Sequence, residues 1–307
     1  MESDKLDLDF AYKYPFSSEA KEVISKEHGP LNESLIKMGK TRLEEDLNAN
    51  DIKFSHTTIN DIKRTYVLSY VYSRMLISAI NKPLFLEKYV RAEARRSRGA
   101  LEGDSLPNII KLLSELNINV SYSEGRFVIP LPKYLMVSSH IPELGLSRQE
   151  LEKGLVYLDK GRILAFSESA IAHDIRKKLP ISLSELPKGI IDESKTVKLP
   201  KLSLNIEIKE GSYRWIEKIL SNPIEDVRHR TVNLILAPYL TNIKGMSEDD
   251  AAGIILAYIE KCKELNPDTK VNSSYVKYQC RYAKSKGMKP LSKEKARELY
   301  RGIIDLD

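Results

Sequence analysis

Residues 222–240 read NPIEDVRHRTVNLILAPYL and decide how the C-terminal part of the chain folds. Asn222 suits an N-cap, Pro223 suits the first helical position, and the acids that follow suit the positive end of a helix dipole. A helix is therefore predicted from Pro223 onward. At about 100° per residue, its apolar and polar residues fall on opposite sides. The apolar set is Ile224, Val227, Leu234 and Ile235, and the polar set is Asp226, His229, Arg230 and Asn233.

Arg228 departs from this pattern, because it projects from the apolar side near the predicted helix start. An arginine held beside free backbone N–H groups can bind an anion. Alternatively, its stem packs against the core while its head reaches water. The residues by themselves leave both interpretations open.

The basic residues are unevenly distributed along a chain of 307 residues, a length typical of two or three domains. The formal net charge is only +6, yet residues 261–301 hold twelve Lys or Arg against four Asp or Glu. This local excess favours an anionic partner, with nucleic acid first and acidic protein second. The alternative is a solvated lysine-rich face of the kind found on thermophilic proteins.

Motifs for catalysis or metal binding are missing from the sequence. Cys262 and Cys280 are the only cysteines, and two thiols cannot form a zinc ribbon or an iron–sulfur site without other ligands. The run Gly39-Lys40-Thr41 lacks the first glycine of a P-loop. An autonomous catalytic centre is therefore not expected. The sequence also has no apolar leader or membrane span, which predicts a cytoplasmic protein.

The predicted fold is mainly α with a small α+β domain and a small antiparallel sheet. Two hairpins are expected in that sheet: NVSYS-EG-RFVIPL at 119–131 and LVYL-DKG-RILAF at 155–166. A segment rich in Pro, Lys, Ser and Glu after Pro180 marks the domain boundary. The predicted domains are a helical body (1–104 with about 167–200), the small domain (105–166), a linker (201–211) and a helical C-terminal domain (212–307).

The second hairpin is apolar on both faces, because Leu155 and Tyr157 alternate with Val156 and Leu158. One face should meet the local core. The other face is either a partner surface or is covered by the predicted helix at 167–179.

Two helices carry stripes of basic side chains. Arg91, Arg95 and Arg98 share a face at i, i+4 and i+7, which forms either a contact for nucleic acid or acidic protein, or a solvated face. In a C-terminal helix, tyrosines at 275, 278 and 282 form one stripe, which is predicted to point into the core. A basic stripe on the opposite side should then face solvent or a ligand, and it consists of Lys277, Arg281 and Lys284.

The first 200 or so residues resemble the N-terminal region of the archaeal and eukaryotic-type DNA primase large subunit (PriL), through the helical body, LVYLDKGRILAF and the Pro/Lys-rich tail. The segments IEDVRHRTVNLILAPYL and SSYVKYQCRYAKSK resemble the cluster-free accessory primase subunit of crenarchaea (PriX). The large subunit's C-terminal domain carries four cysteine ligands for a [4Fe–4S] cluster, which two cysteines cannot supply. The resemblance therefore implies a fusion, natural or engineered, without this cluster.

That resemblance implies a non-catalytic primase subunit for RNA primer synthesis in DNA replication. The small domain would bind the catalytic small subunit, whose carboxylates and Mg²⁺ or Mn²⁺ would perform the chemistry. The C-terminal domain would hold the initiating ATP- or GTP-type ribonucleotide, near the single-stranded DNA template and RNA primer. Its 5′-triphosphate needs several cations, and the residues expected to supply them are Arg228, Arg230, Lys277, Arg281 and Lys284. Asp226 or Asn233 would contact the ribose 2′-OH, and His229 would stack or bind phosphate. The competing hypothesis is a basic helical nucleic-acid-binding or scaffold protein without nucleotide selectivity.

Overall fold

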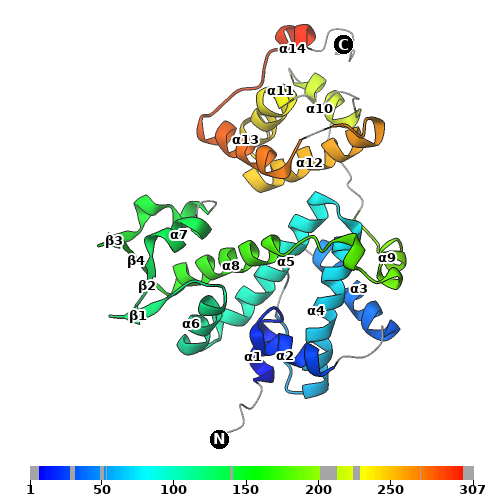
Figure 1. Ribbon diagram of the computed structural model, residues 1–307. Coiled ribbons are helices and arrows are strands. Elements are labelled where there is room, and N and C mark those ends of the chain that lie inside the picture. The colour runs from blue at the N-terminus through cyan, green and yellow to red at the C-terminus, as the bar shows by residue number, and fades with distance from the viewer. Residues whose placement is uncertain are drawn as a thin grey trace, which may run out of the picture. The chain divides into compact units, whose positions relative to one another are not determined.

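The computed structural model describes residues 7–27, 32–48, 52, 54–138, 141–200, 213–223, 229–269 and 271–299 (Figure 1). By its internal contacts the chain divides into two compact units, residues 1–200 and 201–307. Helices dominate both units, and four short strands of the first unit form an antiparallel sheet. This confirms the predicted fold class. None of the described helices is long and apolar enough to cross a bilayer.

A helical body is built around α4 (Asn60–Ile80), which packs against α1, α2, α3, α5 and α9. Its apolar residues surround most of the helix, as expected for a helix that others enclose. The helix ends at Asn81, which adopts the left-handed conformation with φ 46°. The other helices of the body's first half are α1 (Leu8–Lys13), α2 (Ser18–Lys26), α3 (Glu33–Asn48) and α5 (Pro83–Glu102).

Gly39 lets α3 approach α4 closely. A Cβ added at Gly39 would lie 2.4 Å from the Tyr72 Cβ and 2.9 Å from the Ser73 backbone nitrogen. Only glycine fits a contact this short. The Gly39-Lys40-Thr41 run thus serves helix packing, and Lys40 forms an ion pair with Glu193 at 2.7 Å.

The sheet has the strand order β1-β2-β4-β3. The first hairpin is confirmed, with Glu124 and Gly125 as its two turn residues, at φ 52° and 78°. The second predicted hairpin is wrong: β4 pairs with the preceding strand β3, through a turn at Lys153 and Gly154, at φ 47° and 79°. The strands are β1 (Ser121–Ser123), β2 (Arg126–Pro130), β3 (Glu150–Glu152) and β4 (Leu155–Leu158).

Asp159, which the sequence placed in a hairpin turn, is the N-cap of α8 (Lys160–Lys177), and its Oδ1 accepts a hydrogen bond from the Arg162 N–H at 2.8 Å. The capping preference of aspartate outweighs the turn preference of the DKG run. Helix α8 packs along α5 and also contacts β2 and β4 (Figure 1). The remaining helices and 3₁₀ turns of the unit are α6 (Leu106–Glu115), α7 (Leu131–Ser138), η1 (Pro142–Leu144), η2 (Leu146–Arg148), η3 (Leu183–Glu185) and α9 (Lys188–Ser194).

The C-terminal unit is helical. Asn222 is the C-cap of α10 (Arg214–Ser221), since its N–H bonds the Lys218 and Ile219 carbonyls. The residues that its predicted N-cap role would involve, 224–228, lie outside the described residues. Asp226 and Arg228 lie outside the described residues. Two π-helical segments follow α11, a feature often found at functional sites. The further elements are α11 (His229–Thr231), η4 (Val232–Leu236), η5 (Tyr239–Ile243), α12 (Glu248–Leu265), α13 (Ser273–Ser285) and α14 (Lys293–Leu299).

Candidate functional site

Two of the three tyrosines of α13 are exposed and Tyr275 is half-buried, so the prediction that this stripe points into the core is wrong. Tyr278 is 56% exposed and Tyr282 is 42% exposed. The buried side of α13 consists instead of Val276, Cys280 and Ala283, whose i, i+4, i+7 spacing also follows the helical repeat. Small side chains allow α13 to pack closely on α12, whereas a tyrosine hydroxyl would need a buried partner. The structure therefore places an aromatic stripe on the surface of the most basic region of the chain.

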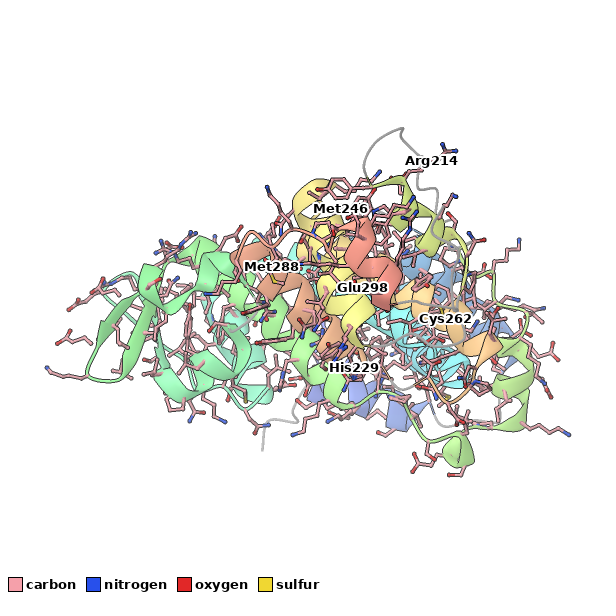
Figure 2. The ribbon with its side chains drawn as sticks, turned by 90° about the horizontal axis from the view of Figure 1, so that it is seen from above. Arg214, His229, Met246, Cys262, Met288 and Glu298 are labelled. Atoms are coloured by element: carbon pink, nitrogen blue, oxygen red, sulfur yellow. The ribbon has the colours of Figure 1, made fainter. Side chains whose placement is uncertain are left out.

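The exposed rings are ordered by stacking. The Tyr278 and Tyr282 rings lie nearly parallel, with centroids 6.0 Å apart and an interplanar angle of 16°. At the start of the same helix, the Tyr275 ring lies 4.5 Å from the His229 ring, and its hydroxyl donates to the His229 carbonyl at 3.3 Å. His229 begins α11 (Figure 2). The contacts between His229 and Tyr275 thus join the two segments of the sequence that resemble PriX.

The cationic side chains of α13 contact the start of α12 and the residues just before it. The Arg281 Nε lies 3.6 Å from a Glu248 oxygen of α12, and the Lys284 Nζ donates to the Met246 carbonyl at 3.4 Å. Helical spacing puts Lys277 on the same side as Arg281 and Lys284. His229 and Arg230 of α11 are both exposed. The convergence of both groups on one triphosphate stays a prediction.

Asn233 offers an unused acceptor next to this surface. It follows His229 by four residues, in the first π-helical segment. Its Oδ1 atom is buried and has no hydrogen-bond partner in the described structure. A buried amide oxygen without a donor is costly, so such an atom often marks a ligand or water position. Its predicted role toward a ribose stays a prediction.

The arginine stripe of α5 is only partly available to a nucleic acid. Arg98 pairs with Glu168 of α8 at 2.8 Å and with Glu102 at 3.8 Å. Arg95 is exposed and Arg91 is half-buried. The basic stripe therefore contributes to helix packing at one end, and a nucleic-acid contact there stays a prediction.

The predicted partner surface on β4 is corrected at two positions. Val156 and Leu158 are fully buried on the sheet face that α7 and α8 cover, so they cannot contact a partner. Leu155 and Tyr157 point to the other face and are half-buried. On that face the Arg126 guanidinium lies 4.8 Å from the Tyr157 ring and forms an ion pair with Glu150.

A buried ionic cluster in the helical body was not anticipated from the sequence. Glu93 is 1% exposed and accepts hydrogen bonds from both Arg42 and Arg96. Arg42 belongs to α3, so the cluster joins helices that are distant in sequence. The only available signal was that Glu93 and Arg96 are spaced at i, i+3 on one helix.

In the described residues, no group of three His, Cys, Asp or Glu side chains could hold a metal ion. Both cysteines are buried, and burial raises the pKa of the Cys280 thiol to about 12. A thiol that stays protonated is a poor nucleophile and a poor metal ligand. The cysteines therefore serve packing.

Two comparisons relate this chain to known proteins. Residues 213–306 match the family model Primase X (PriX). The DNA primase large subunit PriL of Methanococcoides burtonii is 25% identical over 273 residues, which cover 78% of this chain and 74% of the relative. That of Methanosarcina mazei is 24% identical over 203 residues, which cover 62% of this chain and 52% of the relative.

The resemblances noted in the sequence are thereby confirmed, with the PriX-like part in the second compact unit. The chain is homologous to the DNA primase large subunit over most of its length and carries a Primase X domain at residues 213–306.

Proposed function

We propose that this chain is a non-catalytic primase subunit that binds the catalytic small subunit through its small α+β domain and holds the initiating ribonucleotide and template through its C-terminal unit. The observation that carries this proposal is the exposed aromatic and cationic surface of the Primase X domain. Stacked tyrosines, a histidine ring and several cations lie on or beside α13.

Each part of that surface matches a part of the ligand. Exposed rings stack on bases regardless of sequence, which suits a template strand. Arginine and lysine side chains bind phosphate oxygens, and arginine does so bidentately. Selection of ribose needs a partner for the 2′-OH, and Asn233 has a buried oxygen without a hydrogen-bond donor. The surface on and beside α13 therefore offers complementary groups both to a ribonucleoside triphosphate and to a single strand.

The small domain offers the docking face for the catalytic subunit. Leu155 and Tyr157 lie on the sheet face opposite α7 and α8 and are half-buried there. Val128 pairs with Tyr157 across the sheet, so it points to the same face and adds an apolar side chain there, as is typical of a partner surface. Tyr122 and Leu151 pair with Phe127 and Val156 and therefore belong to the opposite face.

The nucleotide part is tested by comparing ATP with dATP binding to the full chain and to Arg228→Ala and Asn233→Ala variants. Loss of a charged hydrogen bond should cost on the order of 1.5–3 kcal/mol for Arg228→Ala with either sugar. Asn233→Ala should weaken ATP but not dATP. Lys198→Ala, in the other unit, is the matched control and should bind like the wild type.

Indifference to the sugar and to both substitutions would favour the second hypothesis, a nucleic-acid-binding protein without nucleotide selectivity. The stacked pair Tyr278–Tyr282 gives that hypothesis its own support, because stacking alone binds single strands of either sugar. A dinucleotide made by the chain alone with Mg²⁺ or Mn²⁺ would contradict both hypotheses.

A further inference from the structure

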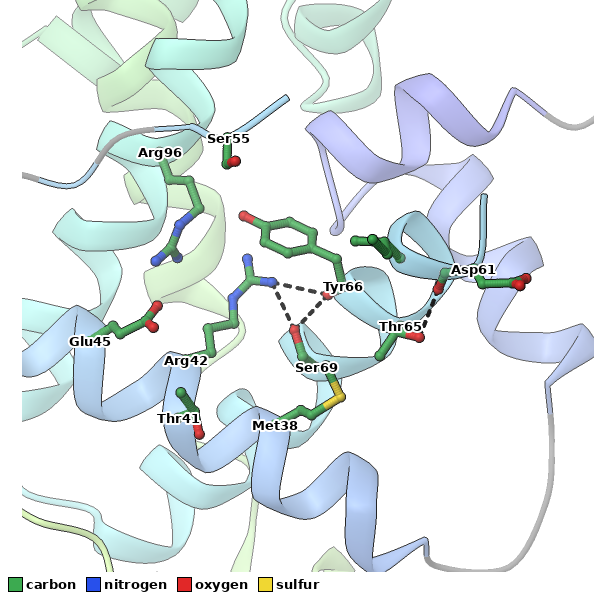
Figure 3. A pocket seen from close by; sticks show the side chains of 11 residues that line it. Met38, Thr41, Arg42, Glu45, Ser55, Asp61, Thr65, Tyr66, Ser69 and Arg96 are labelled. Atoms are coloured by element: carbon green, nitrogen blue, oxygen red, sulfur yellow. Dashed lines mark hydrogen bonds between the residues drawn. The ribbon is translucent and has the colours of Figure 1, made fainter. Parts of the chain in front are cut away.

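Two helices of the helical body face each other across a cavity of about 510 Å³, a volume in the range of ligand pockets (Figure 3). The helices run antiparallel, because Gly39 of α3 lies against Tyr72 of α4 whereas Arg42 donates to the Tyr66 carbonyl. On each helix the lining residues are spaced at i, i+3, i+4 and i+7, so the cavity is a groove between two helix faces. These residues are Met38, Thr41, Arg42 and Glu45 of α3, and Ile62, Thr65, Tyr66 and Ser69 of α4.

The floor of this groove is a cluster of guanidinium groups that are already paired. Glu93 holds Arg42 bidentately, with N–O distances of 2.6 and 2.7 Å, and the Arg42 Nη1 donates to a backbone carbonyl and a hydroxyl of α4. Arg96 donates to Glu93 at 3.0 Å, and its Nη2 lies 2.6 Å from the Asp46 carboxylate. Arg42 and Arg96 are only 4% and 7% exposed. Neither guanidinium of the floor is therefore available to an anionic ligand.

The other charged residues that line the groove, Glu45 and Asp61, are both acidic and exposed. Glu45 has no ion-pair partner among the residues that the structure describes. The Asp61 carboxylate lies 3.9 Å from the Arg64 guanidinium, but these side chains are 91% and 51% exposed, so the pair contributes little. Burial raises the pKa of Asp46, and when that residue is protonated the floor carries one positive charge, which the two exposed carboxylates still outnumber. The groove is therefore a negatively charged site.

The same groove exposes large apolar side chains to solvent. Met38 and Ile62 line it and are 42% and 49% exposed, and Ile59, which directly precedes α4, is 56% exposed. Apolar side chains that gather beside a cavity are typical of a surface that receives a partner's side chains. The exposed part of the groove therefore combines apolar surface with negative charge.

We propose that this groove is a docking site for a segment of a partner protein in which an arginine or lysine is flanked by bulky apolar residues. The apolar side chains pack on Met38 and Ile62, while the cation is attracted by the carboxylates of Glu45 and Asp61. Charge complementarity selects this occupant, because the two carboxylates repel a nucleic-acid strand or an acidic segment. A free polyamine would leave the apolar side chains uncovered. The proposal concerns the first compact unit and does not depend on the function of the Primase X domain.

The test uses the full chain with ¹³C-labelled methionine and isoleucine methyl groups. The probes are acetylated and amidated hexapeptides in which one arginine has leucine or phenylalanine on either side. A matched panel replaces the arginine by citrulline, which keeps the shape of the side chain and removes its charge, and a second panel replaces it by glutamate. We expect an arginine peptide to shift the Met38 and Ile62 methyl resonances saturably. Its citrulline counterpart should bind about three- to tenfold more weakly, and the glutamate peptide more weakly still.

On the protein, the double variant Glu45→Gln/Asp61→Asn should weaken the arginine peptide by the same factor and leave the citrulline peptide unchanged, because both side chains are exposed and only their charges are removed. Glu185→Gln is the matched control, since Glu185 is exposed in the same unit and does not line the groove. The proposal is overturned if no arginine peptide shifts these methyls, or if the citrulline peptides or the double variant bind equally well. It is also overturned if hexauridylate, spermidine or a glutamate peptide shifts them at lower concentration than the arginine peptides do.

Discussion

Arg42 of α3 and Glu93 of α5 form a bidentate ion pair inside the helical body, 51 residues apart in sequence and 4% and 1% exposed. Glu93 also accepts a hydrogen bond from Arg96, and Arg42 also donates to the Tyr66 carbonyl and the Ser69 hydroxyl, so neither charge is left without compensation. A buried pair of this kind is weak evidence of net stabilisation, but removal of one partner leaves an uncompensated charge.

Arg42→Met should therefore lower the free energy of unfolding by about 3–5 kcal/mol. The double variant Arg42→Met/Glu93→Leu should recover much of this loss, because it removes the unpaired carboxylate as well. Urea unfolding measures both, with Arg95→Ala as the control on the exposed side of α5, expected within about 0.5 kcal/mol of wild type. A single variant as stable as the control would contradict the role given to the pair.

The raised pKa of Asp46 predicts a specific pH dependence of the free energy of unfolding. Its pKa is raised in the folded chain by burial and by Glu93, so the folded state retains a proton that the unfolded state releases near the ordinary aspartate pKa of about 3.9. The free energy of unfolding should then fall as pH rises from about 4 toward the raised pKa. Asp46→Asn cannot ionise and should lack this decline. Urea unfolding of both proteins from acid to neutral pH measures the difference, and parallel profiles would refute it.

Substitution of glycine by alanine is expected to change stability in opposite directions at Gly39 and at Gly189. At Gly39 an added Cβ would clash with Tyr72 and Ser73, so Gly39→Ala should cost about 1–3 kcal/mol of stability. At Gly189, in α9, a Cβ meets nothing within 4 Å, and alanine favours a helix by up to about 1 kcal/mol. Thermal or urea unfolding distinguishes them. Equal effects would mean that α3 can shift away from α4.

The stacked tyrosines should contribute to binding of single-stranded nucleic acid. Tyr278→Ala and Tyr282→Ala are each expected to weaken binding of an oligothymidylate by about 1–3 kcal/mol, because each removes a ring on which a base stacks. Stability should hardly change, since both side chains are exposed. Tyr122→Ala is the matched control, as Tyr122 is 43% exposed in the other unit. Fluorescence anisotropy at fixed salt measures the affinities, and equal affinity of all variants would exclude a stacking role.

The outer sheet face should determine association with a primase catalytic small subunit. Leu155→Glu places a charge on this face and should weaken co-purification at least about tenfold, as expected for a central contact of an interface. Leu106→Glu is the control, because Leu106 is 38% exposed on α6 and lies outside that face. Quantitative pull-down with the small subunit measures both. If Leu155→Glu binds the small subunit as well as the wild type does, the interface must lie elsewhere on the chain.

Local signals in the sequence were sufficient for most helices. Such signals act within a few residues: the side chains of Ser17, Ser105 and Ser247 accept hydrogen bonds in the first turns of α2, α6 and α12. The Lys153-Gly154 turn was overlooked in favour of the DKG run, because both segments have turn residues and only strand pairing with β2 chooses between them. The same limit applied to the tyrosines of α13, whose spacing fits either face.

By itself, the sequence determined the helical class, the local caps, the first hairpin and the resemblance to primase subunits, since each depends on residues that are close together in the chain. Tertiary structure decided which α13 face is buried, and it brought Arg42, Glu93 and Arg96 together under a cavity. The physical reason is that burial depends on which helices meet, and a charge that appears solvated in a helical pattern is buried when a partner from a distant segment compensates it.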